Sequence, residues 1–435
     1  MNGMARARRR DRRVYLGSHP VLLALLAAAQ RLPVLRLGGT LLVNGETEYR
    51  EALTRLPLDR LAAGTTGAIA RELAADGRLL FDEDGATHRG TRRTAADDLG
   101  AAGVRRLRPV WQAVLDDRLP ALARGETIDM VEVTRAIAGA TVAKMSTVDA
   151  CPLAIAQAAG DVASASVREH LSGPRFLATL LGAAGRSSGG ARAGRTGASF
   201  GGAAGRSSGG ARAGRTGASF GGAAGRSSGG ARGARTEAEA ATARLTALLG
   251  GGPDAGLATV LAVTAVSTTV AGLPRAVAWC ADAGLWTDAA DDTRREALVD
   301  ELLRVVAAVP VVTRVSGEDG AIGGCPVRKG DKLLLVARHA VAAHRRDPDP
   351  ARPAPPSTGQ LVFGAGPHAC PGARLARAQL DDTLRALAPY RPVVVKSTVD
   401  RKAALPGWSS LLIRGVDPSR TPADPRGLAS SWGQR

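Results

Sequence analysis

The sequence predicts a mainly α-helical domain with a small β part. Hydrophobic residues make up 45% of the chain and aromatic residues only 3%, so alanine, leucine and valine must fill the core. Alanine and leucine favour helix. The long, almost uncharged run over residues 255–281 is the strongest helical segment. Between residues 311 and 338, β-branched residues and turn signals indicate short strands.

The remaining elements follow from hydrophobic periodicity in chain order. We expect an amphipathic helix over residues 21–29, a strand over 38–43 and a helix over 46–56. Apolar residues three and four apart continue over the segments 88–122, 130–145, 154–171, 294–309 and 375–387. Pro274 should kink or end the 255–281 helix, because proline lacks the N–H that a helix interior requires.

Most of the net charge of +18 lies in two segments that look flexible. Residues 183–236 carry nine arginines and no acid, in an 18-residue sequence that starts at 183, recurs at 203 and begins a third time at 223. A segment without apolar periodicity cannot bury enough surface to offset its ordering entropy. We therefore expect a flexible insert at 183–236, with a docking arm for an acidic partner as the alternative. Residues 1–13, with six arginines, and 418–435 are expected to be disordered tails.

Several other classes of protein are disfavoured by composition. No aromatic ladder or nucleic-acid motif accompanies the arginines, which excludes nucleic acid as the expected partner. The cysteines Cys151, Cys280, Cys325 and Cys370 form no CxxC pair, so a zinc site or disulfide scaffold is not expected. No stretch is expected to reach the roughly 18 apolar residues of a membrane span. The sequence therefore predicts a cytoplasmic protein with no membrane partner.

The stretch with chemical meaning is Phe363-Gly364-Ala365-Gly366-Pro367-His368-Ala369-Cys370-Pro371-Gly372. Gly364 and Gly366 permit a tight turn through backbone conformations that other residues avoid. Cys370 stands just before an expected helix start, where free N–H groups and the positive end of the helix dipole stabilise a thiolate. Gly372 allows a flat ligand and the following helix to approach closely.

This stretch resembles the Phe-x-x-Gly-x-x-x-Cys-x-Gly core of the cytochrome P450 family, and the resemblance extends over roughly residues 35–416. It implies one haem-thiolate domain spanning residues 1–435, with the triangular, mainly helical fold of that family and a small β part. The implied cofactor is haem b, with Cys370 as the axial ligand of the iron. Phe363, Gly364 and Gly372 would contact the macrocycle.

Further residues match family positions. Glu301 and Arg304 are three apart on a helix and would form the family's buried structural pair. By the same resemblance, His88 and Arg92, four apart on one helical face, would hold a haem propionate, although a solvated helix start is the alternative. Arg314 and His368 match positions that neutralise propionates.

The run Thr264-Ala265-Val266-Ser267-Thr268-Thr269 departs from the family's Ala-Gly-x-Asp/Glu-Thr-Thr. Thr268 matches the alcohol that acts in catalysis, with back-bonding to the helix as the alternative, and Ser267 replaces the acid. Proton delivery would then use water, a substrate group or Ser267.

A second departure is Ala337-Arg338-His339, where the family has Asn-Arg-Asp, and we expect a repacked loop there. The 183–236 insert falls at the loop that covers the substrate pocket in the family.

The resemblance implies a monooxygenase that hydroxylates or epoxidises a small hydrophobic molecule, in bacterial secondary metabolism by analogy. Since no flavin or iron–sulfur motif is present, electrons would come from a ferredoxin and a ferredoxin reductase. A monomer is expected. One alternative is an atypical haem-thiolate enzyme that uses peroxide, couples or rearranges its substrate. The other is a non-catalytic protein of this fold that binds a partner through the insert.

Overall fold

The computed structural model describes residues 3–63, 65, 67–68, 70–71, 90, 92–93, 97–171, 225–252 and 255–416. The helices within these residues are α1 (Gly3–Ser18), α2 (Pro20–Ala29), α3 (Glu46–Thr54), α6 (Ala101–Arg118), α7 (Pro120–Ala123), α8 (Met130–Met145), α9 (Pro152–Leu171), α11 (Gly225–Leu248), α12 (Ala255–Ala283), α13 (Trp286–Ala290), α14 (Asp292–Val306), α15 (Ala337–Ala340), α16 (Pro356–Gly359) and α17 (Ala373–Leu387). The repeats over 183–224 and the expected tail at 418–435 lie outside the described residues.

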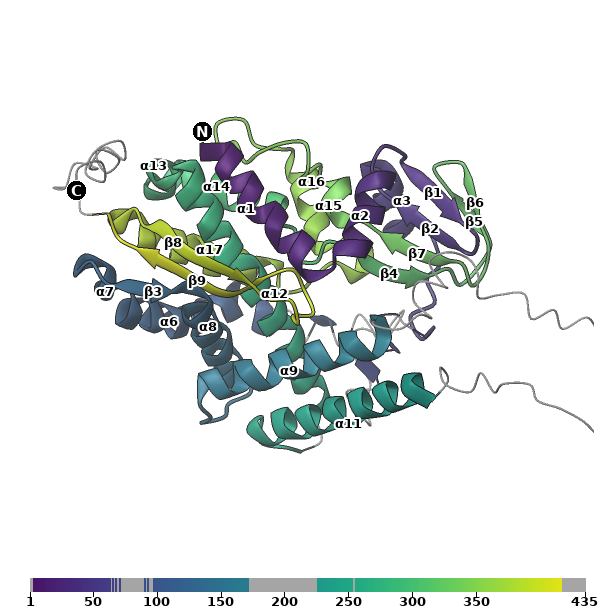
Figure 1. Cartoon of the computed structure of the whole chain (residues 1–435), viewed down its shortest axis with the longest axis horizontal. Coiled ribbons are helices and arrows are strands. Elements are labelled where there is room, and N and C mark those ends of the chain that lie inside the picture. Colours follow the sequence, from purple (N-terminus) through teal and green to yellow (C-terminus); the bar gives the residue numbers. More distant parts are fainter. Residues whose placement is uncertain are drawn as a thin grey trace, which may run out of the picture.

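The β part is small, as the sequence predicts. The strands are β1 (Val34–Leu37), β2 (Thr40–Val43), β3 (Thr127–Asp129), β4 (Val312–Val315), β5 (Gly320–Ile322), β6 (Cys325–Val327), β7 (Lys332–Leu335), β8 (Val393–Val399) and β9 (Trp408–Arg414). They form one sheet in the order β1-β2-β7-β4, a second in the order β3-β9-β8, and the β5-β6 hairpin. Within the first sheet β2 and β7 are parallel, with Thr40 opposite Lys332. This sheet lies at one end of the molecule, and helices form most of the rest (Figure 1).

Helix α12 is the central element. Its length and hydropathy would suit a membrane span, which differs from the expectation that no stretch is so apolar. However, α12 packs against α1, α8, α9, α14 and both long strands of the β3-β9-β8 sheet. The helix also runs through Pro274 to Ala283 instead of ending there. Leu273, Ala276 and Val277 are buried on either side of the proline, and this packing offsets the missing backbone hydrogen bond.

The N-terminal segment is ordered, so the prediction of a disordered tail over residues 1–13 was wrong from Gly3 onward. Helix α1 buries Ala7, Asp11, Val14 and Tyr15. Because these positions are three or four apart, one face of α1 packs against the body while the arginines occupy the other. The count of arginines suggested disorder, but their placement around the helix is that of a docked amphipathic element.

A buried ionic cluster fixes α1 to α12. The Asp11 carboxylate accepts two hydrogen bonds from the fully buried Arg275, of 2.9 Å and 2.6 Å, and lies 3.4 Å from the Arg338 guanidinium. Both guanidinium groups stack on the Tyr15 ring, at 4.5 Å and 4.0 Å from its centroid. The Tyr15 hydroxyl donates to the Val306 carbonyl at 2.6 Å. The Asp11 charge therefore compensates a guanidinium that has no access to water.

We expect Asp11→Asn to lower the free energy of unfolding by about 3 kcal/mol, because it leaves Arg275 buried without a counter-ion. Urea denaturation followed by circular dichroism measures the change. Asp117→Asn is the matched control, since the Asp117 side chain is 74% exposed beside Arg118 and should have almost no effect. Equal stability of the two variants would contradict this reading of the cluster.

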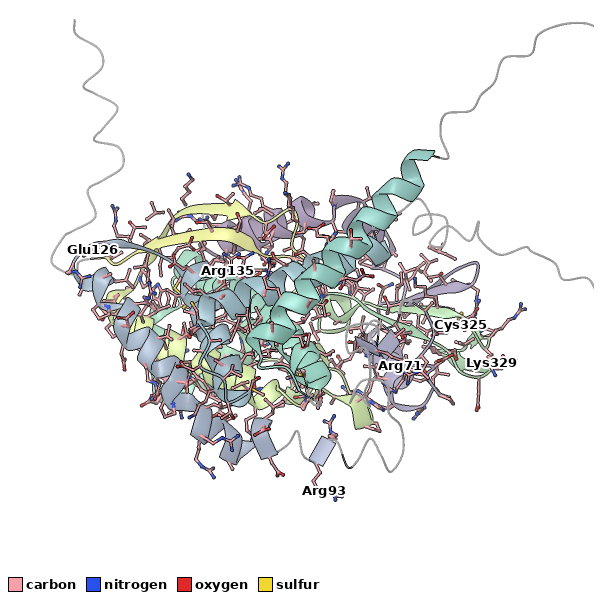
Figure 2. The ribbon with its side chains drawn as sticks, turned by 90° about the horizontal axis from the view of Figure 1, so that it is seen from below. Arg71, Arg93, Glu126, Arg135, Cys325 and Lys329 are labelled. Atoms are coloured by element: carbon pink, nitrogen blue, oxygen red, sulfur yellow. The ribbon has the colours of Figure 1, made fainter. Side chains whose placement is uncertain are left out.

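Helix α11 begins inside the segment that we expected to be flexible. It starts at Gly225, so the expectation of a structureless insert was wrong for residues 225–236. Its C-terminal part buries Ala238, Ala241 and Leu245 against α9 and α12. Once this part is anchored, adding residues to an existing helix requires no new nucleation, which explains how a glycine-rich and serine-rich sequence extends it. Figure 2 shows the N-terminal end of α11 projecting beyond the body.

Candidate functional site

The loop that carries Cys370 connects two short 3-10 turns, η1 (Gln360–Phe363) and η2 (Gly366–His368), to the start of α17. Gly364 and Gly366 have φ of 78° and 71°, in the left-handed region that favours glycine. A side chain at Gly366 would also place Cβ 3.1 Å from the Leu53 carbonyl oxygen of α3. The two glycines therefore give the loop its sharp turn and let it lie close to α3.

The Cys370 backbone is held tightly. Its N–H donates to the Phe363 carbonyl at 2.7 Å, which closes the loop. Gly372 is the N-cap of α17, and a Cβ there would lie 3.7 Å from the Cys370 sulfur. Although Cys370 as a whole residue is exposed, its sulfur lies at the start of a helix with loop backbone packed around it.

Opposing effects act on the thiol. Desolvation by the surrounding protein raises the pKa of Cys370 above its ordinary value. The N–H of Gly372, the Arg92 guanidinium, the N–H of Ala373 and the Arg377 guanidinium each act to lower that pKa. These groups are the ones that stabilise a thiolate, and an iron atom bound to the sulfur would favour deprotonation further.

Two arginines, Arg92 and Arg377, contact the Cys370 loop. Arg92 donates to the Ala369 carbonyl at 2.7 Å, whereas its neighbour Arg93 points away from the body (Figure 2). Arg377, on the first turns of α17, lies over the Phe363 ring at 4.8 Å from the centroid and pairs with Asp300 of α14 at 2.6 Å. Arg377 has no role in the predictions made from the sequence. Its position one helical turn beyond Ala373, directly after the Cys370 loop, was the available signal.

Glu301 and Arg304 form an ion pair inside the protein. Both side chains are at most 2% exposed, and the guanidinium donates to the two carboxylate oxygens at 2.9 Å and 2.7 Å. Glu301 also accepts the N–H groups of Asp349 and Ala354. Arg304 donates to the carbonyls of Val341, Arg346 and Asp347. The pair therefore fixes the irregular segment that leads from α15 towards the Cys370 loop.

Ser267 and Thr268 lie on different sides of α12. The Thr268 hydroxyl donates to the Thr264 carbonyl at 2.8 Å, which is the back-bonding that the sequence analysis gave as the alternative. Ser267 lines a cavity of about 590 Å³ between α8, α9, α12 and the loop between β8 and β9. Its buried Oγ has no hydrogen-bond partner among the described residues. Neighbouring helix residues point about 100° apart, so the two hydroxyls do not face one space.

The structure describes three of the four residues expected at the haem propionates, Arg92, Arg314 and His368. Arg314 lies on β4, where burial and the nearby charge of Arg60 lower its pKa to about 10, with Tyr49 acting in the opposite direction. A carboxylate beside Arg314 would offset both effects. His368 lies in η2, two residues before Cys370. His88 lies outside the described residues, so its pairing with Arg92 stays a prediction.

The second departure from the family pattern is a compact histidine pair. His339 bonds the Asn44 side chain at 2.8 Å, and its ring lies 4.8 Å from that of His344. Burial is the main reason that the pKa falls to about 3 for His339 and about 4 for His344, and the charges of Arg338 and Arg345 add to it. Both imidazoles are therefore neutral in the folded protein at neutral pH.

The histidine pair should make the protein sensitive to mild acid. The unfolded chain binds protons at these residues below its histidine pKa of 6.5 while the folded protein does not, so stability falls as pH falls from 6.5 towards 4. We expect a loss of about 2 kcal/mol or more between pH 6.5 and 4.5. His339→Gln with His344→Gln should flatten that slope in urea titrations.

The pH window separates this effect from that of the carboxylates. Glu301 and Asp382 also have lowered pKa values, but they start from ordinary values of 4.5 and 3.8. They therefore reduce stability mainly below pH 4.5. An unchanged slope between pH 6.5 and 4.5 in the double variant would refute the assignment. His19, whose pKa burial also lowers, should account for the slope that remains.

Comparisons with known proteins show what these features are similar to. The model of the cytochrome P450 family matches residues 295–387, which include the Glu301–Arg304 pair and the Cys370 loop. The chain is 33% identical over 122 residues to 6-deoxyerythronolide B hydroxylase of Saccharopolyspora erythraea, a match that covers 27% of this chain and 30% of that protein. It is 36% identical over 98 residues to luteothin monooxygenase of Streptomyces thioluteus, which covers 21% and 23%. These matches span less than a third of either relative.

Solved structures agree with the fold over nearly the whole chain. P450BioI in complex with an acyl carrier protein that carries hexadec-9Z-enoic acid superposes with a TM-score of 0.62 at 16% identity, covering 92% of this chain and 99% of that one. A mutant of P450 EryK in complex with erythromycin B gives 0.59 at 17% identity, covering 92% and 98%. The mainly helical fold with a small β part is thus confirmed, and it is the fold of these cytochrome P450 structures.

Proposed function

We propose that this protein is a haem-thiolate monooxygenase that oxidises a small hydrophobic molecule. The observation that carries the proposal is the Cys370 thiol at the start of α17, surrounded by the N–H groups of Gly372 and Ala373 and by two guanidinium groups. Backbone donors of this kind tune a sulfur that ligates iron. The Glu301–Arg304 pair holds the adjacent chain in place.

The residues present suit a haem b. Cys370 would supply the sulfur that binds the iron. Arg92, Arg314, His368 and His88 would neutralise the two propionates. Burial and the charge of Arg60 lower the pKa of Arg314, and a propionate beside it would offset both effects. When bound, the haem supplies O2 activation, in which one oxygen atom enters the substrate and the other leaves as water with two electrons and two protons. The electrons would come from a ferredoxin and its reductase.

The α12 hydroxyls are the protein's own groups for handling protons at this site. In the structure the Thr268 hydroxyl donates to the Thr264 carbonyl, so its oxygen keeps a lone pair that can accept a hydrogen bond from water. Ser267 cannot act as the acid that the family has at its position. Protons would therefore reach Thr268 from water rather than from a carboxylate.

We expect Thr268→Ala to lower the product formed per NADPH consumed by about tenfold or more, because positioned proton transfer contributes about 10²-fold or more to such steps. The spectrum of the reduced carbon monoxide complex should not change. Thr264→Ala is the matched control, since Thr264 is one turn earlier on the same face and its hydroxyl also bonds back to its helix, at 2.8 Å to Val260. Equal losses in both variants would show that helix structure, not proton handling, is affected.

Isotope labelling tests the proposed reaction. With ferredoxin, reductase and NADPH, the product should contain one oxygen atom from ¹⁸O2, and NADPH consumption should depend on substrate. A turnover product without the label would rule out oxygen insertion. Because the substrate is not identified, a panel of hydrophobic small molecules that shift the Soret band supplies the candidates.

The second candidate is an atypical haem-thiolate reaction, such as peroxide use, coupling or rearrangement. Ser267 favours it, because this residue replaces the family's acid and its Oγ has no partner among the described residues. Turnover with hydrogen peroxide alone, unaffected by Ser267→Asp, would support this candidate. Strict dependence on ferredoxin and O2 would exclude peroxide use.

We further propose that the protein works as a monomer in the bacterial cytoplasm, in secondary metabolism. The relatives support this setting only by analogy. One is named a hydroxylase of 6-deoxyerythronolide B and comes from Saccharopolyspora erythraea. The other is named luteothin monooxygenase and comes from Streptomyces thioluteus.

A further inference from the structure

Helix α2 has an unusual composition for its position. From Pro20 to Ala29 it contains no polar or charged side chain. One face is used in the core, since Leu26 and Ala29 pack against Leu42, Leu334 and Val336 of the β1-β2-β7-β4 sheet. The other face is exposed, with Val21 58% and Leu25 36% accessible to solvent. A helix that is apolar all round is normally buried on all sides, so the outer face of α2 lacks a covering partner among the described residues.

The exposed face of the preceding helix, α1, carries both cations and an apolar residue. Arg9, Arg12 and Leu16 are all exposed, and their spacing of three and four residues places them along one stripe. Leu16, 46% exposed, is at the end of α1, which is followed after His19 by α2. Figure 1 shows α1 and α2 following one another along one side of the molecule. We call Arg9, Arg12, Leu16, Val21 and Leu25 the α1–α2 surface.

The exposed charges that α1 and α2 themselves carry have one sign, although Arg8 pairs with Asp347 and Arg10 with Asp282 of other segments. Between Gly3 and Leu32 the only acid is Asp11, and its buried carboxylate pairs with Arg275. The exposed Arg401 and Lys402 follow Asp400, whose carbonyl accepts a hydrogen bond from Ser18 at the end of α1. Apolar side chains at the α1–α2 junction are thus flanked by cations that have no exposed acid beside them on these two helices.

We propose that the α1–α2 surface binds the surface of an anionic lipid bilayer. Arginine side chains attract anionic headgroups, while apolar side chains insert at the boundary between headgroups and acyl chains. Nucleic acid would use the arginines but would leave Val21 and Leu25 exposed to water. With only ten residues, α2 is far too short to span a bilayer. The proposed contact is therefore with the membrane surface and is not a span through it.

This surface would bring a hydrophobic substrate and its enzyme to the same interface. The proposal does not depend on the proposed reaction, because it rests on the exposed side chains of α1 and α2 alone. A protein without monooxygenase activity that still binds vesicles would support the surface and refute the reaction. An active enzyme that binds no vesicles would support the reaction and refute the membrane-binding surface.

Vesicle sedimentation with the full-length holoprotein tests the proposal. The probes are vesicles of phosphatidylcholine alone and of phosphatidylcholine with phosphatidylglycerol. We expect binding to the anionic vesicles only, weakened by salt. Both Val21→Ser with Leu25→Ser and Arg9→Gln with Arg12→Gln should reduce the bound fraction by about tenfold. All four residues are exposed, so the Soret band and circular dichroism should not change.

The matched control variants replace the same kinds of exposed residue at positions outside α1 and α2. Leu61→Ser with Val416→Ser removes two exposed apolar residues, and Arg118→Gln with Arg124→Gln removes two exposed arginines near α7. Neither control should alter vesicle binding. Equal binding of all variants, or no binding by wild type, would overturn the proposal. So would a dimer, seen by size-exclusion chromatography, that Val21→Ser with Leu25→Ser dissociates, because the surface would then bind a second copy.

Discussion

Cys370→Ala is expected to abolish the strongly red-shifted Soret band of the reduced carbon monoxide complex. That band requires a thiolate on the iron, and Cys370 is the only cysteine in the loop that precedes α17. Oxidation of substrate should fall to background in the same variant, because the thiolate is the group that favours O–O cleavage. This is the largest effect on activity that we expect from any single substitution.

The controls for Cys370→Ala separate ligation from folding. Cys151→Ser changes another exposed cysteine, which precedes α9 and is distant in sequence from the loop, and it should leave the band unchanged. Cys370→Ser keeps the size of the side chain and should also lose the red-shifted band. The two Cys370 variants should retain the circular dichroism of the wild type, since the loop is closed by backbone bonds such as Cys370 N–H to Phe363 O. A red-shifted band that survives in Cys370→Ala would refute the assignment of the ligand.

Glu301→Gln is expected to have the largest effect on stability. Arg304 is 1% exposed, and removing its counter-charge should lower the free energy of unfolding by about 3–5 kcal/mol. The amide of glutamine can replace only one of the two carboxylate oxygens as an acceptor. The N–H groups of Ala354 and Asp349 donate to the Glu301 carboxylate at 2.9 Å and 3.1 Å. In the variant they would compete for the single acceptor oxygen of the amide. The segment between α15 and the Cys370 loop should therefore loosen, and haem content should fall with stability.

A double-mutant cycle with Arg304→Leu measures the pair itself. If the cost is an uncompensated charge, Glu301→Gln combined with Arg304→Leu should be less destabilised than the sum of the single variants. Full recovery is not expected, because three carbonyls and one of the two N–H groups lose their partners. Glu126→Gln is the control, since Glu126 is paired with Arg124 on an exposed loop. Additive losses in the cycle would show that the two residues act independently.

Much of the candidate site follows from local sequence. The glycines at 364 and 366 adopt the positive φ that their position in a tight turn requires, and Cys370 comes just before α17 as the pattern indicates. The three-residue spacing of Glu301 and Arg304 on a helix brings their side chains together. These features depend on backbone geometry and on nearest neighbours in the chain, so the sequence carries the information directly.

Other features were decided by contacts between distant segments. The arginine-rich N-terminus forms α1 because Asp11 meets Arg275 and Tyr15 meets Arg338, partners more than 250 residues away. Similarly, His339 meets Asn44, which is 295 residues away in the chain, and the anchored end of α11 extends a helix into the repeats. Composition alone suggested disorder for both arginine-rich segments.

The sequence by itself determined the resemblance to the cytochrome P450 family, the Cys370 loop and the main helices, because each depends on residues that are close together along the chain. Tertiary structure decided which way neighbouring side chains face. It directs Ser267 into a cavity and leaves Thr268 bonded to its own helix, and it turns the arginines of α1 outward beside an apolar helix face. The physical reason is that burial and ion pairing depend on the segments packed around a residue, and periodicity in one segment does not specify its neighbours.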